Sequence, residues 1–206
     1  MSNLKNLSKD KLIEMINQLK VDNEALKVMT ELYKQMNDKI VELERQQNLN
    51  LQYLRRDTIE ISGIPSSVKQ DDLEGEVVKI FDAAKVKVHN KKLKFKNIQA
   101  CHRIGKKGVT IVKFTNRKFA REAMYCGKNL KDTDLYGGSR VYLNHSFCPE
   151  FRFLNYLIRK AKNDGKLFKW KVTNGVNYVQ VMEDGDFEEV SHKSDLVSLG
   201  IDIDNE

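Results

Sequence analysis

The sequence is poor in residues that break regular structure, with two prolines and eleven glycines among 206 residues. That composition argues against a long flexible tail, because disordered segments are rich in such residues. Three cysteines lie far apart and form no C-x-x-C pair, which argues against a disulfide framework and a zinc site. The sequence also lacks an apolar run of membrane-spanning length and a recognisable secretory signal. We therefore expect reduced thiols, no membrane association, and a location in the cytoplasm or the nucleus.

Charged residues are abundant but unevenly distributed. Residues 1–54 contain eight basic and eight acidic residues, whereas residues 85–182 contain 23 basic and five acidic ones, a net charge of +18. Residues 183–206 contain one basic and nine acidic residues. A basic block within a segment that has the pattern of a folded domain is typical of a protein that binds a polyanion. The alternative is a solvated, lysine-rich surface.

Residues 1–54 follow a seven-residue period without proline or glycine, which predicts a coiled coil that serves oligomerisation. With Leu12 as position a, nine of the ten a and d positions up to Leu43 are apolar, and Asp22 is the exception. The period weakens at Gln47 and Asn50. The predicted seam includes Leu12, Leu19, Leu26, Met29, Tyr33, Met36, Ile40 and Leu43.

The number of helices in this coiled coil is less strongly determined. Apolar Ile16 at e and Leu32 at g widen the stripe, and Tyr33 at a is bulky for a two-stranded seam. These features favour a homotrimer over a dimer. A single amphipathic helix that folds against its own domain is the remaining alternative, which four regular heptads disfavour.

Residues 55–147 alternate strand and helix patterns in the order β-α-β-β-α-β, which predicts an α+β, ferredoxin-like domain. Its four-stranded antiparallel sheet would have two helices on one face. Strands are predicted at 58–64, 98–102, 109–114 and 140–143, and helices around 73–84 and at 116–126.

The predicted third strand, with residues 107–114 (KGVTIVKF), resembles the octapeptide of an RNA-recognition motif. Strand alternation puts Val109 and Ile111 on the open face of the sheet, where that motif has aromatic residues, and Glu60 takes the corresponding place on the first strand. We therefore expect that this sheet does not bind bases by stacking.

Residues 148–206 predict a small α+β C-terminal nucleic-acid-binding domain. Pro149 suits the first position of a helix, and Asn174-Gly175 is a strong signal for a β-hairpin. A two-residue turn would put Lys171 opposite Tyr178 and give the hairpin one basic face and one apolar face.

A coiled coil, a degenerate RNA-recognition fold and a small basic C-terminal domain, in that order, resemble the first-open-reading-frame protein of LINE-type non-LTR retrotransposons. The most specific stretches are residues 100–105 (ACHRIG) and 110–117 (TIVKFTNR), together with the join at residues 140–150. Residues 39–44 (KIVELE) are similar to the family's trimer signature, with lysine in place of arginine. The resemblance implies a homotrimer that coats its own single-stranded RNA, also binds single-stranded DNA, and acts as a nucleic-acid chaperone in cytoplasmic ribonucleoprotein particles.

We expect binding by phosphate contacts along a cleft between the two globular parts, with little regard for sequence. We also expect no enzyme activity, catalytic residue, cofactor, metal or small-molecule substrate, because the four histidines show no metal-site spacing and no nucleophile motif is present. The alternative function is a coiled-coil scaffold whose RNA-recognition fold binds protein. The candidate nucleic-acid-binding residues are Arg55, Arg56, Arg103, Lys107, Lys113, Arg117, Arg121, Lys128, Arg140, Arg152, Tyr156, Arg159, Lys169 and Lys171.

Overall fold

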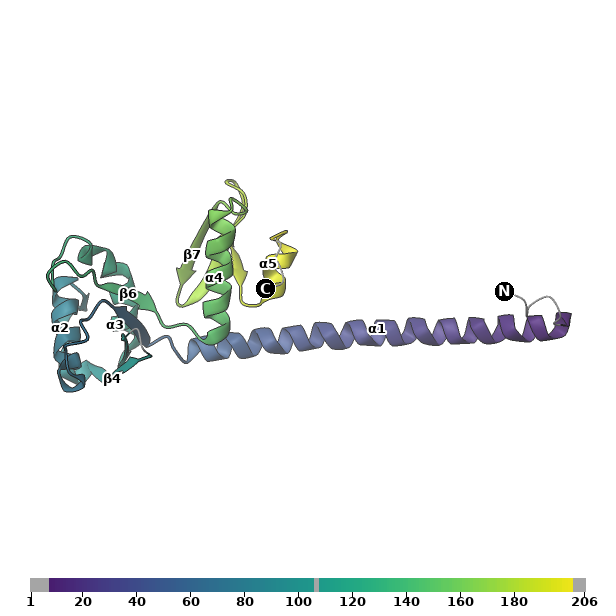
Figure 1. The fold of residues 1–206 in the computed structure, drawn as a ribbon, viewed down its shortest axis with the longest axis horizontal. Coiled ribbons are helices and arrows are strands. Elements are labelled where there is room, and N and C mark those ends of the chain that lie inside the picture. The colour runs from purple at the N-terminus through teal and green to yellow at the C-terminus, as the bar shows by residue number, and fades with distance from the viewer. Residues whose placement is uncertain (1–7, 106–107, 202–206) are drawn as a thin grey trace. The chain divides into compact units, whose positions relative to one another are not determined.

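A computed structural model describes residues 8–105 and 108–201 of the chain (Figure 1). Contacts between residues divide the chain into two units, residues 1–44 and residues 45–206, which are described separately below. No helix in the described part of the chain combines the length and the apolar character needed to cross a membrane.

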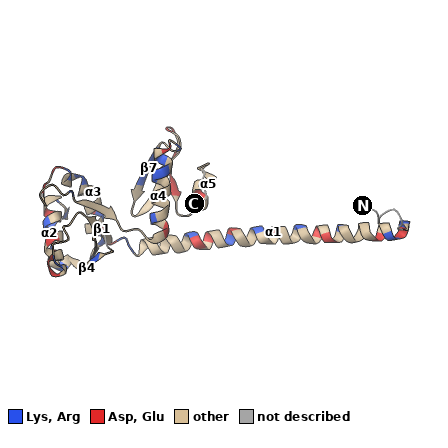
Figure 2. Cartoon of the chain, in the orientation of Figure 1, with Lys and Arg blue, Asp and Glu red and all other residues tan. Residues whose placement is uncertain are grey.

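The first unit is formed by helix α1, Lys9–Tyr53, whose last nine residues belong to the second unit. The helix begins after Ser8, whose hydroxyl accepts a hydrogen bond from the backbone N–H of Lys11 at 3.4 Å. It runs through 45 residues without proline or glycine, which corresponds to roughly 68 Å at 1.5 Å per residue. Basic and acidic residues are interspersed along it, so its charge is nearly balanced (Figure 2).

The apolar stripe of α1 is open to solvent in the single chain. Leu26 is 61% exposed, and the other predicted seam residues are exposed as well, apart from the half-buried Leu12. A row of large apolar side chains at heptad spacing is unfavourable in water, because each would gain about 1.5–3 kcal/mol on burial. The stripe therefore has the character of a surface for partner helices.

The second unit is α+β. Its described helices and strands after α1 are β1 (Thr58–Ser62), η1 (Gln70–Asp72), α2 (Leu73–Ala83), β2 (Lys87–Val88), β3 (Lys91–Lys92), η2 (Phe95–Asn97), β4 (Ile98–Ile104), β5 (Val109–Phe114), α3 (Arg117–Cys126), η3 (Gly127–Leu130), β6 (Tyr142–His145), α4 (Pro149–Asn163), β7 (Lys169–Thr173), β8 (Val176–Gln180), β9 (Glu188–Val190) and α5 (Lys193–Ser198).

A four-stranded antiparallel sheet has the order β4-β5-β1-β6, as the β-α-β-β-α-β pattern predicted. Glu60 is paired with Ile111 on one side and with Asn144 on the other. Burial alternates along β1 and β5, so Ile59, Ile61 and their neighbours of the same parity face the core, while Glu60 and Ile111 lie on the other face.

Helices α2 and α3 cover the same face of this sheet (Figure 1). Val77, Ile80 and Phe81 of α2 join Phe119 of α3 in one buried cluster with the core-facing strand residues. The two aromatic rings of Phe81 and Phe114 lie 5.3 Å apart in its middle. The predicted helices at 73–84 and 116–126 are confirmed within one residue, and Asn116 caps α3 by accepting from the backbone N–H of Lys118.

The last strand of the sheet begins two residues later than predicted, at Tyr142. Ladder pairing ends at Ser62 and Tyr142, because the chain turns away at Gly63, which has a φ of +95°. A Cβ atom at Gly63 would lie 2.1 Å from the carbonyl oxygen of Arg140. Only glycine therefore permits this close approach of the two backbones.

The C-terminal segment, residues 149–201, has a second buried cluster in which α4 packs on the antiparallel sheet β7-β8-β9. The predicted hairpin is confirmed, with Lys171 opposite Tyr178 and Trp170 opposite Val179. Both turn residues, Asn174 and Gly175, have positive φ, as the turns of two-residue hairpins require. Strands β2, β3 and β9 were not predicted from the sequence.

Candidate nucleic-acid interface

The second unit contains a cleft of about 950 Å³, here called the basic cleft. Its walls are the end of α1 with the segment that follows, helix α3, the end of β6, and the turn between β7 and β8. Segments that are distant in the sequence therefore meet at one concave surface. The basic residues that line it are Arg55, Arg56, Arg117, Lys118 and Arg121.

The charge of the basic cleft has one sign. Among the described residues that line it there is no aspartate or glutamate. Arg121 lies 3.4 Å from Glu122, but this exposed pair between neighbouring residues neutralises little. A concave surface with five cations concentrates positive potential, which attracts anionic ligands and accelerates their association.

The guanidinium of Arg56 lies against an aromatic ring of the basic cleft. Its central carbon lies 3.6 Å from the centre of the Tyr53 ring, so the group stacks on the aromatic face. Its Nη1 atom is buried and donates to no acceptor among the described residues. A buried donor without a partner costs free energy. The guanidinium as a whole lines the basic cleft, and its geometry matches that of phosphate oxygens.

Helix α3 contributes a polar stripe at helical spacing. Arg117, Arg121 and Tyr125 follow each other every four residues, and Lys128 lies one turn beyond on the same side. Tyr125 lines the basic cleft, is 71% exposed, and has the Lys128 ammonium 4.9 Å from its ring centre. One face of α3 thus packs in the core while this face presents cations and an aromatic ring.

His145, the last residue of β6, adds an uncharged group to the basic cleft. Burial lowers its pKa to about 4, so its imidazole is neutral at physiological pH. The ring lies 5.8 Å from the Phe147 ring. His145 can therefore take part in hydrogen bonds without adding to the positive charge.

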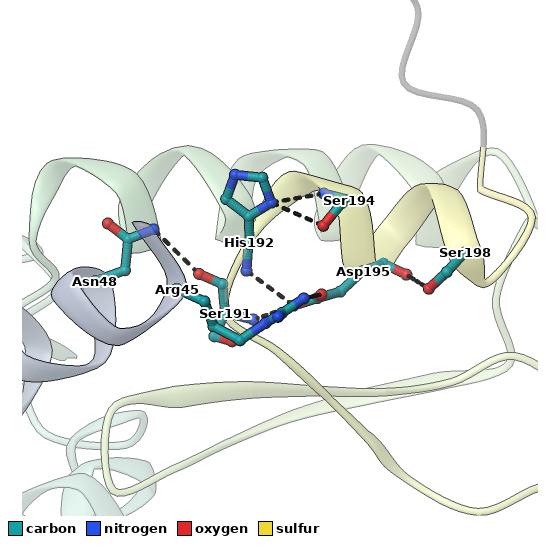
Figure 3. Close-up of polar contacts among 7 residues, drawn as sticks. All are labelled: Arg45, Asn48, Ser191, His192, Ser194, Asp195 and Ser198. Carbon is teal, nitrogen blue, oxygen red and sulfur yellow. Dashed lines mark hydrogen bonds and ion pairs between the residues drawn. The ribbon is translucent and has the colours of Figure 1, made fainter. Parts of the chain in front are cut away.

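The end of α1 is fixed to α5 by polar contacts (Figure 3). Arg45 forms an ion pair of 2.5 Å with Asp195, and the side chain of Asn48 donates to the carbonyl oxygen of Ser191 at 3.2 Å. Asp195 also accepts from the backbone N–H groups of Ser191 and His192 at 2.9 Å each. Burial alone would raise the pKa of Asp195, but these hydrogen bonds outweigh it and hold the pKa below its usual value.

Gln52 joins the remaining walls of the cleft. Its side chain is 2% exposed, donates to the carbonyl oxygen of Ser146 at 3.1 Å and accepts from the backbone N–H of Cys148 at 3.0 Å. Its amide also lies against Gly175, where a Cβ atom would come within 2.6 Å of its nitrogen. This one residue therefore links α1, the β6–α4 connection and the β7–β8 turn.

The structure brings four of the predicted binding residues together in the basic cleft: Arg55, Arg56, Arg117 and Arg121. Lys128 extends the α3 stripe, whereas Lys107 lies outside the described residues. The other predicted residues lie elsewhere on the second unit: Arg103, Lys113, Arg140, Arg152, Tyr156, Arg159, Lys169 and Lys171.

Arg103 is occupied by the fold. Its guanidinium donates to the carbonyl oxygens of Ile64, Pro65 and Val68 at 2.6–3.2 Å and approaches that of Gly108 at 3.5 Å. With these four contacts it holds the loop after β1 against the β4–β5 connection. Its role is therefore structural, and we remove it from the set of candidate phosphate contacts.

Arg152 is similarly engaged, because it forms an ion pair with Glu60 on the open face of the sheet. The predicted basic residues of α4 and β7 lie near aromatic rings instead of lining the cleft. The guanidinium of Arg159 is 5.4 Å from the Trp170 ring, and the Lys171 ammonium is 3.7 Å from the Phe187 ring.

Tyr53, Lys118, Tyr125 and His145 line the basic cleft but were not selected from the sequence. For Tyr125 a signal was present, because it follows Arg121 at the same four-residue spacing that separates Arg117 from Arg121. Within residues 8–105 and 108–201, no three His, Cys, Asp or Glu side chains are grouped so that they could hold a metal ion.

Comparison with models of known protein families gives no match, and comparison with curated protein sequences gives none either.

Proposed function

We propose that this chain is a self-associating protein that binds single-stranded RNA, and also single-stranded DNA, with little dependence on sequence. The observation that carries the proposal is the basic cleft, where five cationic side chains converge without an acidic residue among the described lining. Counterion release from the nucleic-acid backbone would supply most of the binding free energy.

The guanidinium of Arg56, which lines the basic cleft, supports an anionic ligand in particular, because its geometry matches that of phosphate oxygens. Stacking on Tyr53 holds the guanidinium in place before any ligand arrives, so little side-chain entropy is lost on binding.

The four-stranded sheet supports a binding mode that does not depend on the nucleotide sequence. Its strand order and its two helices on one face support our proposal that the domain has a ferredoxin-like RNA-recognition fold. The places where such sheets stack bases hold Glu60, Val109 and Ile111, so bases would not be bound there. Affinity would then come from phosphate contacts in the basic cleft, which recognise no particular base.

The exposed stripe of α1 supports self-association as a parallel coiled coil, with a homotrimer as the proposed state. Three linked clefts on one strand would raise the overall affinity by on the order of 100-fold, because later binding events become intramolecular. Many weak, exchangeable contacts would also let the protein act as a nucleic-acid chaperone.

With the resemblance of residues 100–105 and 110–117 to LINE-type first-open-reading-frame proteins, we propose that the bound RNA is that of a retrotransposon, packaged in cytoplasmic ribonucleoprotein particles.

Two measurements on the full chain test the proposal. Light scattering should give a mass of about 72 kDa, three times 23.9 kDa, and a Leu19→Asp/Leu26→Asp variant should give the monomer mass. Fluorescence anisotropy with labelled oligouridylate should show binding that weakens steeply as salt increases. A monomeric wild type would refute the oligomer, and undetectable or salt-independent binding would refute the nucleic-acid function.

The partly exposed apolar residues Val109 and Ile111 on the open face favour a second candidate, a scaffold whose sheet binds protein. A gel shift with homopolymer RNA separates the two candidates, because a protein-binding scaffold would leave the RNA unshifted.

A further inference from the structure

Two aromatic rings of the basic cleft share one arrangement. Tyr125 on α3 has the Lys128 ammonium over its ring at 4.9 Å, and Tyr53 near the end of α1 has the Arg56 guanidinium over its ring at 3.6 Å. Both side chains remain largely exposed, Tyr125 to 71% and Tyr53 to 59%. In each case one ring face holds a cation and the large exposed area leaves the rest of the ring open to a ligand.

We propose that Tyr125 and Tyr53 stack on unpaired bases of a strand bound in the basic cleft, and thereby make the cleft prefer single-stranded over double-stranded nucleic acid. This inference rests on the proposed nucleic-acid binding and adds the contact that selects the form of the ligand. Bases would then stack in the basic cleft and not on the open face of the sheet, because residues 60, 109 and 111 on that face are not aromatic.

The physical reason for the preference is the accessibility of base faces. In a duplex each base face is covered by its neighbours, whereas a single strand can splay its bases onto aromatic rings. Every base has a π-face, so stacking is tolerant of sequence, as the proposed packaging function requires. A cation beside each ring also strengthens the arrangement, because it can contact the phosphate next to a stacked base.

Tyrosine is well suited to this position. Its ring offers a large apolar face at a low cost in side-chain entropy, while its hydroxyl stays in water. An aromatic side chain on the polar face of α3 gains nothing from the core, since Phe119 and Ala123 already fill that side. Its place between Arg121 and Lys128 leaves the ring available to a ligand of the basic cleft.

The test compares Tyr125→Ala and Tyr53→Ala with the wild type, using labelled oligouridylate and an RNA duplex of equal length. Each substitution should weaken binding of the single strand about fivefold to 150-fold, which corresponds to 1–3 kcal/mol for the loss of one stacked base, and leave duplex binding nearly unchanged. The salt dependence should keep its slope, because no charge is removed. Tyr125→Phe and Tyr53→Phe should retain wild-type affinity.

Tyr142→Ala is the matched control. Tyr142 lies on β6 of the four-stranded sheet, is 53% exposed, and does not line the basic cleft. The variant should bind both probes as the wild type does. Unchanged melting temperatures would show that the variants are folded, as expected for side chains that are more than half exposed.

Salt-dependent wild-type binding with no effect of either Tyr→Ala change would overturn the stacking inference and leave the proposed function standing. An equal loss with both probes, or a larger loss for Tyr142→Ala, would overturn it as well. If the wild type bound neither probe, the proposed function itself would fail, and a labelled acidic protein would be the next ligand to test.

Discussion

Removal of two cations from the basic cleft is the most direct test of how the cleft would bind nucleic acid. Arg117 and Arg121 are exposed on adjacent turns of α3, and both line the cleft. Neither side chain supports the core, so an Arg117→Gln/Arg121→Gln variant should fold normally. We expect it to bind single-stranded RNA more weakly and with a shallower dependence on salt.

The magnitude follows from the number of lining cations. Five phosphate contacts give a slope of log K against log salt of about −3.5 for a single strand, and three contacts give about −2.1. Between 50 and 200 mM salt the wild type should lose about 100-fold in affinity, and the variant about 20-fold. If nonionic contacts are unchanged, the variant should bind about 70-fold more weakly at 50 mM and about tenfold more weakly at 200 mM.

Fluorescence anisotropy titrations over this salt range measure both slopes, preferably on the monomeric Leu19→Asp/Leu26→Asp background, where each molecule has one cleft. The control is Lys91→Gln/Lys96→Gln, which removes the same charge from exposed positions that do not line the cleft. The reasoning is refuted if the arginine variant keeps the wild-type slope, or if the lysine variant loses as much of it.

Four further substitutions test the fold and the proposed coiled coil. Burial lowers the pKa of His145 from 6.5 to about 4, so the unfolded chain takes up a proton at a higher pH than the folded chain does. The free energy of unfolding should therefore fall by up to about 3 kcal/mol as the pH decreases from about 6.5 to about 4. Urea unfolding of the His145→Gln variant should not show this loss. In urea unfolding, Arg45→Gln should destabilise the second unit by about 1 kcal/mol, because the ion pair with Asp195 is lost. Asp195→Ala should cost about 2 kcal/mol, because the hydrogen bonds that this carboxylate accepts at the start of α5 are lost as well. Asp22→Leu should stabilise the proposed coiled coil by about 1–2 kcal/mol per chain, which would raise the melting temperature of a peptide of residues 1–44.

Local patterns in the sequence were sufficient for most of the fold. The absence of proline and glycine through residues 9–53 predicted one continuous helix, and α1 ends at Tyr53. Alternating apolar residues predicted β1 and β5 with the correct faces, and Asn174-Gly175 fixed the hairpin register. Strand β9 was not predicted because Glu188 and Glu189 have a low preference for strands. Pairing with β8 overrides that local preference.

The candidate site was harder to predict because its walls come from distant segments. The residues selected from the sequence included Arg117 and Arg121, which both line the basic cleft, but they also included Arg103, whose acceptors are the backbone carbonyls of residues 64, 65, 68 and 108. Arg152 is paired with Glu60, 92 residues earlier. Periodicity identifies which residues share a face of one element, whereas these partners depend on how loops and elements are placed in space.

Polar residues near the end of α1 anchor the helix within the second unit. Asn48 and Gln52 are buried within the second unit, and their side-chain amides hydrogen-bond to backbone groups of residues 146, 148 and 191. Apolar residues at these positions would leave those backbone groups unsatisfied, at about 1–3 kcal/mol each.

The same helix therefore has two kinds of surface along its length, an exposed apolar stripe up to Leu43 and polar anchors from Arg45 onward. Because Tyr53 and the residues just before it also line the basic cleft, the helix that would assemble the protein forms a wall of the site that would bind the strand. Loosening the anchors should consequently weaken nucleic-acid binding even where every cation of the cleft is retained.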